Sequence, residues 1–136
     1  MMEAEPRDAV AARLAPHADD DFCYVTTHGR VTGRLHEIEI WFALNGATLY
    51  LLSGGGDRSD WVRNVVAQPA VTVRVGDTTY AATARVVPPA TDEDERARTL
   101  VHDKYATGGQ GDLTSWRARA LPIALDVTGV DPGAQS

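Results

Sequence analysis

The stretch HEIEIWFALNGATLYLLS, residues 36–53, decides the fold of this chain. From His36 to Leu44 large apolar residues recur at every second position, which predicts a β-strand with one buried face. Asn45-Gly46 follows, and this dipeptide favours a type I′ hairpin turn because both residues tolerate positive φ. Residues 47–53 supply the partner strand. The stretch therefore predicts an antiparallel hairpin.

The two faces of the first strand carry different chemistry. One face holds an unbroken apolar series after its first member, and the other begins with two acids. Because two carboxylates are costly to bury without partners, we expect the second face to line a wet cleft or a subunit interface. The first face is His36, Ile38, Ile40, Phe42 and Leu44; the second is Glu37, Glu39, Trp41 and Ala43.

Four further segments have the β-branched and aromatic content of strands, which gives six strands in all. No alternation of strand and crossover helix is present, so a doubly wound parallel sheet is excluded. Because closure removes exposed edges, the pattern predicts a mainly β (α+β) domain built as a small antiparallel barrel. The four segments are 22–27, 71–75, 78–87 and 121–127.

Helical patterns flank the strands, and we expect one domain over residues 1–136. The first helix is expected to cover a barrel end, and the second to begin at Ser59 as N-cap and stop before Pro69. Residues 1–20 are predicted to form an N-terminal helix and linker, and residues 129–136 a flexible tail. The helical segments are 7–17, 59–68, 92–105 and 113–120, and 108–111 is predicted to be a flexible link.

Composition excludes several classes of function. The net charge of −6 argues against nucleic-acid binding, and the single cysteine, Cys23, allows no intrachain disulfide. The four histidines show no metal-ligand spacing, so no metal is expected. No apolar run approaches the ~20 residues of a membrane-spanning helix. The acidic start lacks the layout of a secretion signal, which predicts a cytoplasmic protein.

Two glycine-containing loops could bind a ligand. Residues 28–34 combine bare backbone with Arg30, Thr32 and Arg34, donors suited to phosphate or carboxylate oxygens. The alternative is a solvated hairpin tip. Ser53-Gly54-Gly55-Gly56 leads toward a helix N-terminus and lacks the spacing of nucleotide-binding fingerprints; its alternative is a flexible connector.

No nucleophile–base set is recognisable, because no serine has an elbow or triad context. An enzyme without such a set usually borrows its chemistry from a cofactor. Trp61 and Asn64 follow the second loop. The alternatives to ligand binding are that Trp61 packs in the core and that Asn64 is an exposed helix residue.

Several ordered motifs resemble the deazaflavin-dependent nitroreductase and quinone reductase family. They are TTHGRVTGR (26–34), EIWF (39–42), LYLLSGG (49–55), DWVRN (60–64) and QPAVTV (68–73). The resemblance implies a six-stranded antiparallel split β-barrel like that of pyridoxamine-phosphate oxidases, with flanking helices. It also implies that reduced coenzyme F-420, an 8-hydroxy-5-deazaflavin, passes a hydride to a quinone, activated alkene or nitro compound.

The resemblance also implies roles for individual residues. The loop of Arg30, Thr32 and Arg34 would hold the phosphate and acidic tail, and a small-molecule electron acceptor would bind near the ring. Tyr105 is similar to an aromatic position of the family's substrate pocket and is the expected proton donor, with solvent as the alternative. The other expected cofactor contacts are Glu39, Trp41, Ser53, Gly54, Gly55, Asp60, Trp61 and Asn64.

Two departures from the family pattern keep alternatives open. Val31 stands where relatives commonly carry a second basic residue, and Glu39 where many carry proline. The missing cation at Val31 favours FMN as the alternative cofactor, because the single phosphate of FMN needs fewer cations to bind it. A non-catalytic flavin, deazaflavin or haem binder is the other alternative, and the strands could also present a homodimer face.

Overall fold

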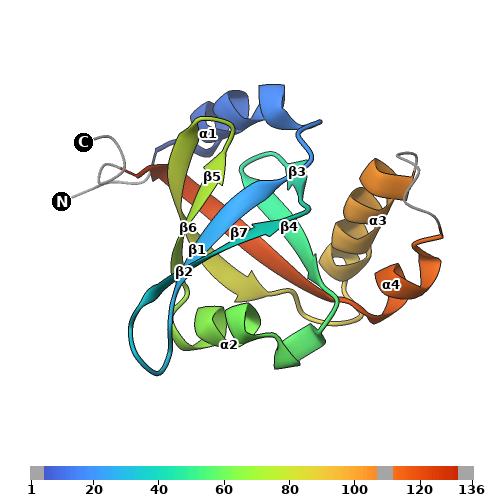
Figure 1. Cartoon of the computed structure of the whole chain (residues 1–136). Coiled ribbons are helices and arrows are strands. Elements are labelled where there is room, and N and C mark those ends of the chain that lie inside the picture. Colours follow the sequence, from blue (N-terminus) through green and yellow to red (C-terminus); the bar gives the residue numbers. More distant parts are fainter. Residues whose placement is uncertain (1–4, 107–111, 132–136) are drawn as a thin grey trace.

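The computed structural model describes residues 5–106 and 112–131, and its seven strands form one antiparallel sheet. The strand order is β2-β1-β5-β6-β7-β4-β3, and the sheet curls into a barrel with helices around it (Figure 1). The strands are β1 (Cys23–His28), β2 (Leu35–Ile40), β3 (Ala43–Asn45), β4 (Thr48–Ser53), β5 (Ala70–Val75), β6 (Thr78–Val86) and β7 (Leu121–Val130).

The prediction of six strands was wrong by one, because the segment from His36 to Leu44 contains two strands. β2 pairs with β1 at one edge of the sheet, and β3 pairs with β4 at the opposite edge. Only Trp41 and Phe42 separate them, so the chain passes directly from one sheet edge to the other. The barrel is therefore split between β2 and β3, and covalent continuity holds the edges together.

The turn between β3 and β4 also differs from the prediction. Asn45 pairs with Thr48 in the ladder, so Gly46 and Ala47 form the turn rather than Asn45-Gly46. Gly46 has φ of 62°, and no positive φ is found at Ala47, which is the pattern of type II′ rather than type I′. Ala47 is buried in the core and its carbonyl accepts the Val127 N–H, so packing sets the turn.

The barrel interior is filled by aliphatic side chains from every long strand, including Val25, Leu49, Val73 and Leu125. The predicted inward face is confirmed at Phe42, which is fully buried. Two helices close the barrel ends (Figure 1): α1 (Arg7–Leu14) at one end, and α2 (Asp60–Ala67) at the other. Their buried faces, Val10 and Leu14 on α1 and Val62 and Val65 on α2, join the same core.

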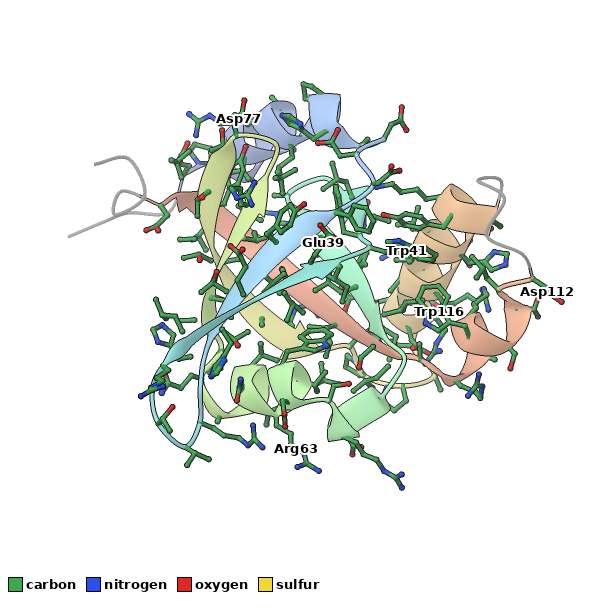
Figure 2. The ribbon with its side chains drawn as sticks, viewed as in Figure 1. Glu39, Trp41, Arg63, Asp77, Asp112 and Trp116 are labelled. Atoms are coloured by element: carbon green, nitrogen blue, oxygen red, sulfur yellow. The ribbon has the colours of Figure 1, made fainter. Side chains whose placement is uncertain are left out.

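A second core lies outside the barrel, where α3 (Asp92–Ala106) and α4 (Thr114–Arg119) pack on the sheet. Ala97 and Val101 of α3 meet Tyr50 and Ala124 of the strands there. Figure 2 shows Trp41 and Trp116 on this side of the molecule.

The predicted bounds of the first two helices and of the C-terminal tail differ in detail from those in the structure. The first helical segment is α1 followed by a 3-10 turn, Ala15–His17, and a second 3-10 turn, Gly56–Arg58, precedes α2. β7 extends to Val130, so the predicted flexible tail was wrong for residues 129 and 130. Residues 132–136 of that tail, and the predicted link 108–111, lie outside the described residues.

Tyr105 of α3 supports the crossing between β2 and β3. Its hydroxyl accepts the Phe42 N–H at 3.0 Å and donates to the Asp21 carbonyl at 2.7 Å. Lys104 Nζ donates to the carbonyls of Phe42, at 2.8 Å, and Asp20, at 2.6 Å. A buried backbone group without a ladder partner must find another partner, and α3 provides it here.

Tyr105→Phe is expected to lower the free energy of unfolding by about 1–3 kcal/mol, because the buried Phe42 N–H and Asp21 carbonyl lose their partner. Urea denaturation measures this. The matched control is Tyr24→Phe, whose hydroxyl bonds Glu39 on the exposed outer face. Equal stability of the two variants would contradict the assigned role of Tyr105.

A network of charged side chains fastens α3 to the sheet. Arg85 of β6 contacts Glu93 at 2.6 Å and Asp126 at 2.7 Å, and Tyr50 donates to Glu93 at 2.7 Å. The hydrogen bond from Arg85, followed by that from Tyr50, lowers the pKa of Glu93 to about 2, although burial opposes the shift.

Because the folded pKa of Glu93 lies below its ordinary value of 4.5, its contribution is complete above pH 4.5 and is lost as pH falls toward 2. Glu93→Gln is therefore expected to lower Tm at pH 7. Between pH 5 and about pH 2–3, the Tm of this variant is expected to fall by less than the Tm of the parental protein. Glu95→Gln, on the same helix but with a 69% exposed carboxylate, is the control expected to keep the parental acid dependence. An unchanged acid dependence in Glu93→Gln would overturn this interpretation.

Candidate functional site

The loop between β1 and β2, residues 29–34, is closed by its own backbone. The Gly29 N–H donates to the Arg34 carbonyl at 2.7 Å, and the Gly33 N–H donates to the Gly29 carbonyl at 2.8 Å. Gly33 has φ of 76°, a conformation that glycine adopts at little cost. Thr32 Oγ1 accepts the Arg34 N–H at 3.3 Å, so the predicted hydroxyl donor also shapes the loop.

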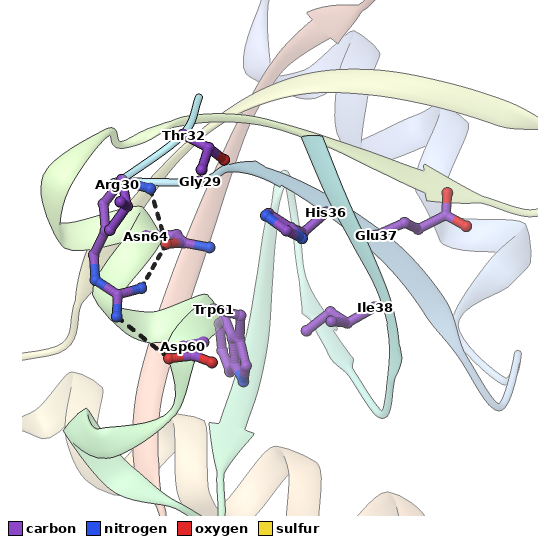
Figure 3. A pocket seen from close by; sticks show the side chains of 10 residues that line it. Gly29, Arg30, Thr32, His36, Glu37, Ile38, Asp60, Trp61 and Asn64 are labelled. Carbon is purple, nitrogen blue, oxygen red and sulfur yellow. Dashed lines mark hydrogen bonds and ion pairs between the residues drawn. The ribbon is translucent and has the colours of Figure 1, made fainter. Parts of the chain in front are cut away.

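Asn64 of α2 joins this loop to the barrel end (Figure 3). Its Oδ1 accepts the Arg30 backbone N–H at 3.2 Å and Arg30 Nη1 at 2.9 Å, and its Nδ2 donates to Thr27 Oγ1 at 3.2 Å. Asn64 and Thr27 are both buried. Asn64 is thus a buried residue with every contact directed at the hairpin, not an exposed helix residue.

Arg30 is held by a second contact on the same helix. Its Nη2 lies 3.3 Å from Asp60 Oδ1, and the Asp60 side chain is 84% exposed. An ion pair this exposed contributes little to stability, so an anion could displace the carboxylate at low cost. The guanidinium is therefore oriented by Asn64 and remains accessible to a ligand.

A pocket of about 520 Å³ lies between the hairpin, β2 and the first turn of α2 (Figure 3). Trp61 and Ile38 provide apolar walls, and Arg30 provides a cation at the rim. The full lining is Gly29, Arg30, Val31, Thr32, His36, Glu37, Ile38, Asp60, Trp61 and Asn64.

The structure brings five of the expected cofactor residues into this pocket: Arg30, Thr32, Asp60, Trp61 and Asn64. These five come from two segments that are 28 or more residues apart in sequence, as the 30-residue separation of Arg30 and Asp60 illustrates. The pocket lining does not include Arg34, Glu39, Trp41, Ser53, Gly54, Gly55 or Tyr105.

The second glycine loop is organised around Ser53. The buried Ser53 hydroxyl donates to the Gly56 carbonyl at 3.0 Å and lies 2.9 Å from Ser59 Oγ. Ser59 is the N-cap residue of α2, as expected, but its hydroxyl makes no cap bond to the helix. A Cβ on Gly55 would come within 2.4 Å of Ser59 Oγ, so glycine is required for this packing.

The aromatic residues expected near the ring form a separate cluster beside that loop. Trp41 stacks on Tyr105 with ring centroids 4.2 Å apart and meets Trp116 edge-on at 5.6 Å. A Cβ on Gly54 would lie 3.5 Å from Trp116 Nε1, so this indole borders the bare Gly54 backbone. Trp116 was not predicted from the sequence.

Tyr105, the expected proton donor, is placed in a structural position. Its hydroxyl is occupied by the backbone of Phe42 and Asp21, and burial raises its pKa to about 12. Glu39 likewise points to the outer sheet face, where it accepts the Tyr24 hydroxyl (Figure 2). The structure brings neither residue to the pocket.

Sequence reasoning indicated the loop that contains Gly29 and Val31 and expected the face of Glu37 to line a cleft or interface, but it missed His36 and Ile38 as lining residues. His36 and Ile38 alternate on the inward face of β2 directly after the arginine loop, and that position could have indicated them. Cys23 is buried as predicted, and burial raises the pKa of its thiol to about 12, so it is not a reactive group.

Comparison with known proteins identifies the family. A family profile described as F420H(2)-dependent quinone reductase matches residues 7–128. The chain belongs to this family. It is therefore a deazaflavin-dependent oxidoreductase with coenzyme F-420 as cofactor, and the FMN and non-catalytic alternatives give way to this assignment.

Solved structures show how widely the fold of this reductase is shared. An F420-H2 dependent reductase is 21% identical with a TM-score of 0.63, covering 78% of this chain and 94% of its own. HutZ, a haem storage protein from Vibrio cholerae, is 13% identical with a TM-score of 0.63, and the match covers 93% of this chain and 91% of HutZ. A domain-swapped dimer is 20% identical with a TM-score of 0.64, and the match covers 79% of this chain and 81% of the chain in that dimer. At these identities the likeness shows the fold alone, and no curated protein matches the chain.

The pocket of this reductase fits the family's cofactor. Its volume accommodates a tricyclic ring, Trp61 and Ile38 offer apolar contact, and Arg30 offers a forked donor for a phosphate. Within residues 5–106 and 112–131, no group of acidic, cysteine or histidine side chains could hold a metal ion. None of the helices in those ranges is long and apolar enough to cross a membrane.

Asn64→Ala is expected to lower the free energy of unfolding by about 1–3 kcal/mol, because buried Thr27 loses a partner and the Arg30 loop loses its attachment to α2. Thermal or urea denaturation measures the change. Gln68→Ala, an exposed amide at the end of the same helix, is the control expected to match the parental protein. Parental stability in Asn64→Ala would contradict this role.

Proposed function

We propose that the pocket between the β1–β2 loop and α2 holds the deazaflavin, and that the protein uses it to reduce a quinone. One observation carries the proposal: the cation of Arg30 and the indole of Trp61 line one pocket and are fixed by the same helix. The two groups match the two ends of the cofactor, an anionic tail and an aromatic ring.

The anionic end would bind at the loop. Arg30 is oriented by Asn64, and its Nη2 donates to the exposed Asp60 carboxylate, which a phosphate would replace. Arg34 makes no side-chain hydrogen bond or ion pair with the rest of the described chain, so it is available for the acidic tail. Val31, at the position where relatives carry a cation, is 86% exposed and leaves this task to the two arginines.

The ring end would lie against Trp61 and Ile38. Apolar walls of this kind exclude water and hold a planar ring in one orientation. When bound, the reduced deazaflavin supplies the hydride for the reaction. The protein's own part is to place the ring and the acceptor face to face, which accounts for much of the rate in reactions of this type.

The acceptor would lie in the same pocket, on the face of the ring that Trp61 and Ile38 leave open. The second glycine loop lies outside this pocket lining, and Trp116 packs there on the bare Gly54 backbone, with Trp41 edge-on to it. A quinone is the acceptor named by the family, while nitro compounds and activated alkenes are the other acceptors to be compared. Ser53, Gly54, Gly55 and Trp41 remain proposed cofactor contacts, as the family resemblance implies.

The proposal extends to assembly and location. β2 is an edge strand with exposed Leu35, Glu37 and Glu39, and edge strands of this length are often covered by another chain. A neighbour of the same fold is a domain-swapped dimer, which supports a homodimer here. We place the protein in the cytoplasm.

The double variant Arg30→Ala/Arg34→Ala is expected to weaken coenzyme F-420 binding at least about 100-fold, because two charged hydrogen bonds are lost. Fluorescence titration of the purified protein measures the affinity, and thermal denaturation shows that the fold is kept. Arg63→Ala, which removes an exposed arginine of α2 outside the pocket, is the control expected to bind normally. Equal affinity in the double variant would disprove the loop assignment.

The function itself is tested by parallel titrations with coenzyme F-420 and FMN, followed by reduction assays on a quinone, a nitroaromatic and an activated alkene. Saturable binding of the deazaflavin with the fastest turnover on the quinone is the expected result. Preference for the nitroaromatic or the alkene would reassign the acceptor, and binding of FMN alone would overturn the proposed cofactor site.

A further inference from the structure

Reduction of a quinone to a hydroquinone needs a proton donor as well as a hydride. Among the side chains that line the pocket, Arg30 stays protonated at all ordinary pH values, and the exposed carboxylates of Glu37 and Asp60 accept protons when ionised. Trp61 and Asn64 do not titrate in this range. His36 is the lining residue whose type exchanges a proton near neutral pH.

The structure holds the His36 ring at the pocket wall through Gly29. A Cβ on Gly29 would come within 2.9 Å of His36 Nε2 and 3.2 Å of its Cδ2, so the imidazole packs on bare backbone. Gly29 is itself fixed by its hydrogen bond to the Arg34 carbonyl. Any larger residue at position 29 would displace the ring.

The imidazole is also unoccupied by the protein. His36 makes no hydrogen bond or ion pair with another described residue, unlike His17 and His102, which contact Asp20 and Asp103. Figure 3 shows its ring directed into the pocket, on the same side as Asn64 and Trp61. The ring therefore has no hydrogen-bond partner among the described residues, although its Nε2 packs against the Gly29 backbone.

We propose that His36 is the proton donor of the reaction, a role that rests on the proposed function of the pocket. The acceptor's carbon or oxygen takes a hydride with its electron pair, and its negative oxygen takes the proton of the His36 imidazolium. The bound cofactor would supply the hydride and would release one proton to solvent, and His36 would be protonated again from solvent. One quinone thus gains two electrons and two protons.

The charged groups around His36 shape this exchange. Arg30 and Arg34 of the loop are cations, whereas Glu37 of β2 and Asp60 of α2 are carboxylates, and His28 of β1 is a second imidazole on the same hairpin. Binding of an anionic cofactor tail adds negative charge at the loop, which favours the imidazolium form.

The first test is His36→Gln, which keeps a polar side chain but cannot release a proton at neutral pH. We expect kcat for quinone reduction to fall about 100-fold, within the usual contribution of general acid catalysis, with KM changed less than about threefold. The dependence of kcat on pH is expected to differ from that of the parental protein. His28→Gln, on the same hairpin but outside the pocket lining, is the matched control expected to keep the parental profile.

Binding supplies a readout that does not depend on turnover. The dissociation constant of oxidised coenzyme F-420, measured by fluorescence, is expected to stay within about threefold of the parental value in His36→Gln. A strong loss of affinity with kcat unchanged would overturn the proposal, because His36 would then be a binding residue. A parental kcat and pH profile in His36→Gln would overturn it as well.

Two further variants test position and chemistry separately. Gly29→Ala retains the imidazole but moves it, so an intermediate loss of kcat is expected, and full activity would contradict the importance of the ring's place. In His36→Gly, added imidazole is expected to restore part of kcat, and absence of any rescue together with a pH profile like the parental one counts against proton donation.

Failure of this inference is distinguishable from failure of the proposed function. If the parental protein binds no deazaflavin, or reduces no quinone once loaded, the function of the pocket is wrong. If the parental protein is active and His36→Gln is equally active, the pocket stands and the proton comes from elsewhere.

Discussion

The structure depends on the backbone of Phe42, where the chain leaves one edge of the sheet for the other. At this crossing the peptide groups have no strand partner, and buried peptide groups must be hydrogen-bonded. Tyr105 and Lys104, neighbours on α3, supply those bonds with a hydroxyl and an ammonium group, and Lys104 Nζ also lies 3.8 Å from the Phe42 ring centroid. Burial lowers the pKa of Lys104, which is the energetic cost of placing a cation there.

The crossing explains why the pocket lies where it does. Because the chain is committed to the opposite edge after Ile40, β2 remains an edge strand and pairs only with β1. The hairpin of β1 and β2 therefore projects from the barrel, and α2 lies across the barrel end beside it (Figure 1). Asn64 converts this contact into a defined site, since one buried amide bonds both the loop and the strand that carries it.

Much of the fold could be predicted from alternation and turn signals, because the period of apolar residues reports directly on which face is buried. The strand boundaries around Trp41 could not, since the apolar pattern continues through the crossing without interruption. The turn at Gly46 was misplaced by one residue because burial of Ala47, a tertiary contact, outweighed the local preference of Asn-Gly. The motif resemblance named Arg30, Trp61 and Asn64, which the structure brings to one pocket, but it did not indicate His36, whose ring packs on the bare backbone of Gly29.

From the sequence alone the chain is predicted to be β-rich, to have no intrachain disulfide, to carry two glycine loops and to belong to a deazaflavin-dependent family. These follow from local periodicity, residue counts and ordered motifs, which do not require knowledge of distant contacts. Tertiary contacts were needed to show that Tyr105 anchors the chain crossing and that His36 faces the pocket. They also show that the Ser53 hydroxyl makes its hydrogen bonds within its own loop. Each of these depends on residues distant in the sequence or on side-chain packing, and a hydroxyl or imidazole acquires its role from the partners that folding brings to it.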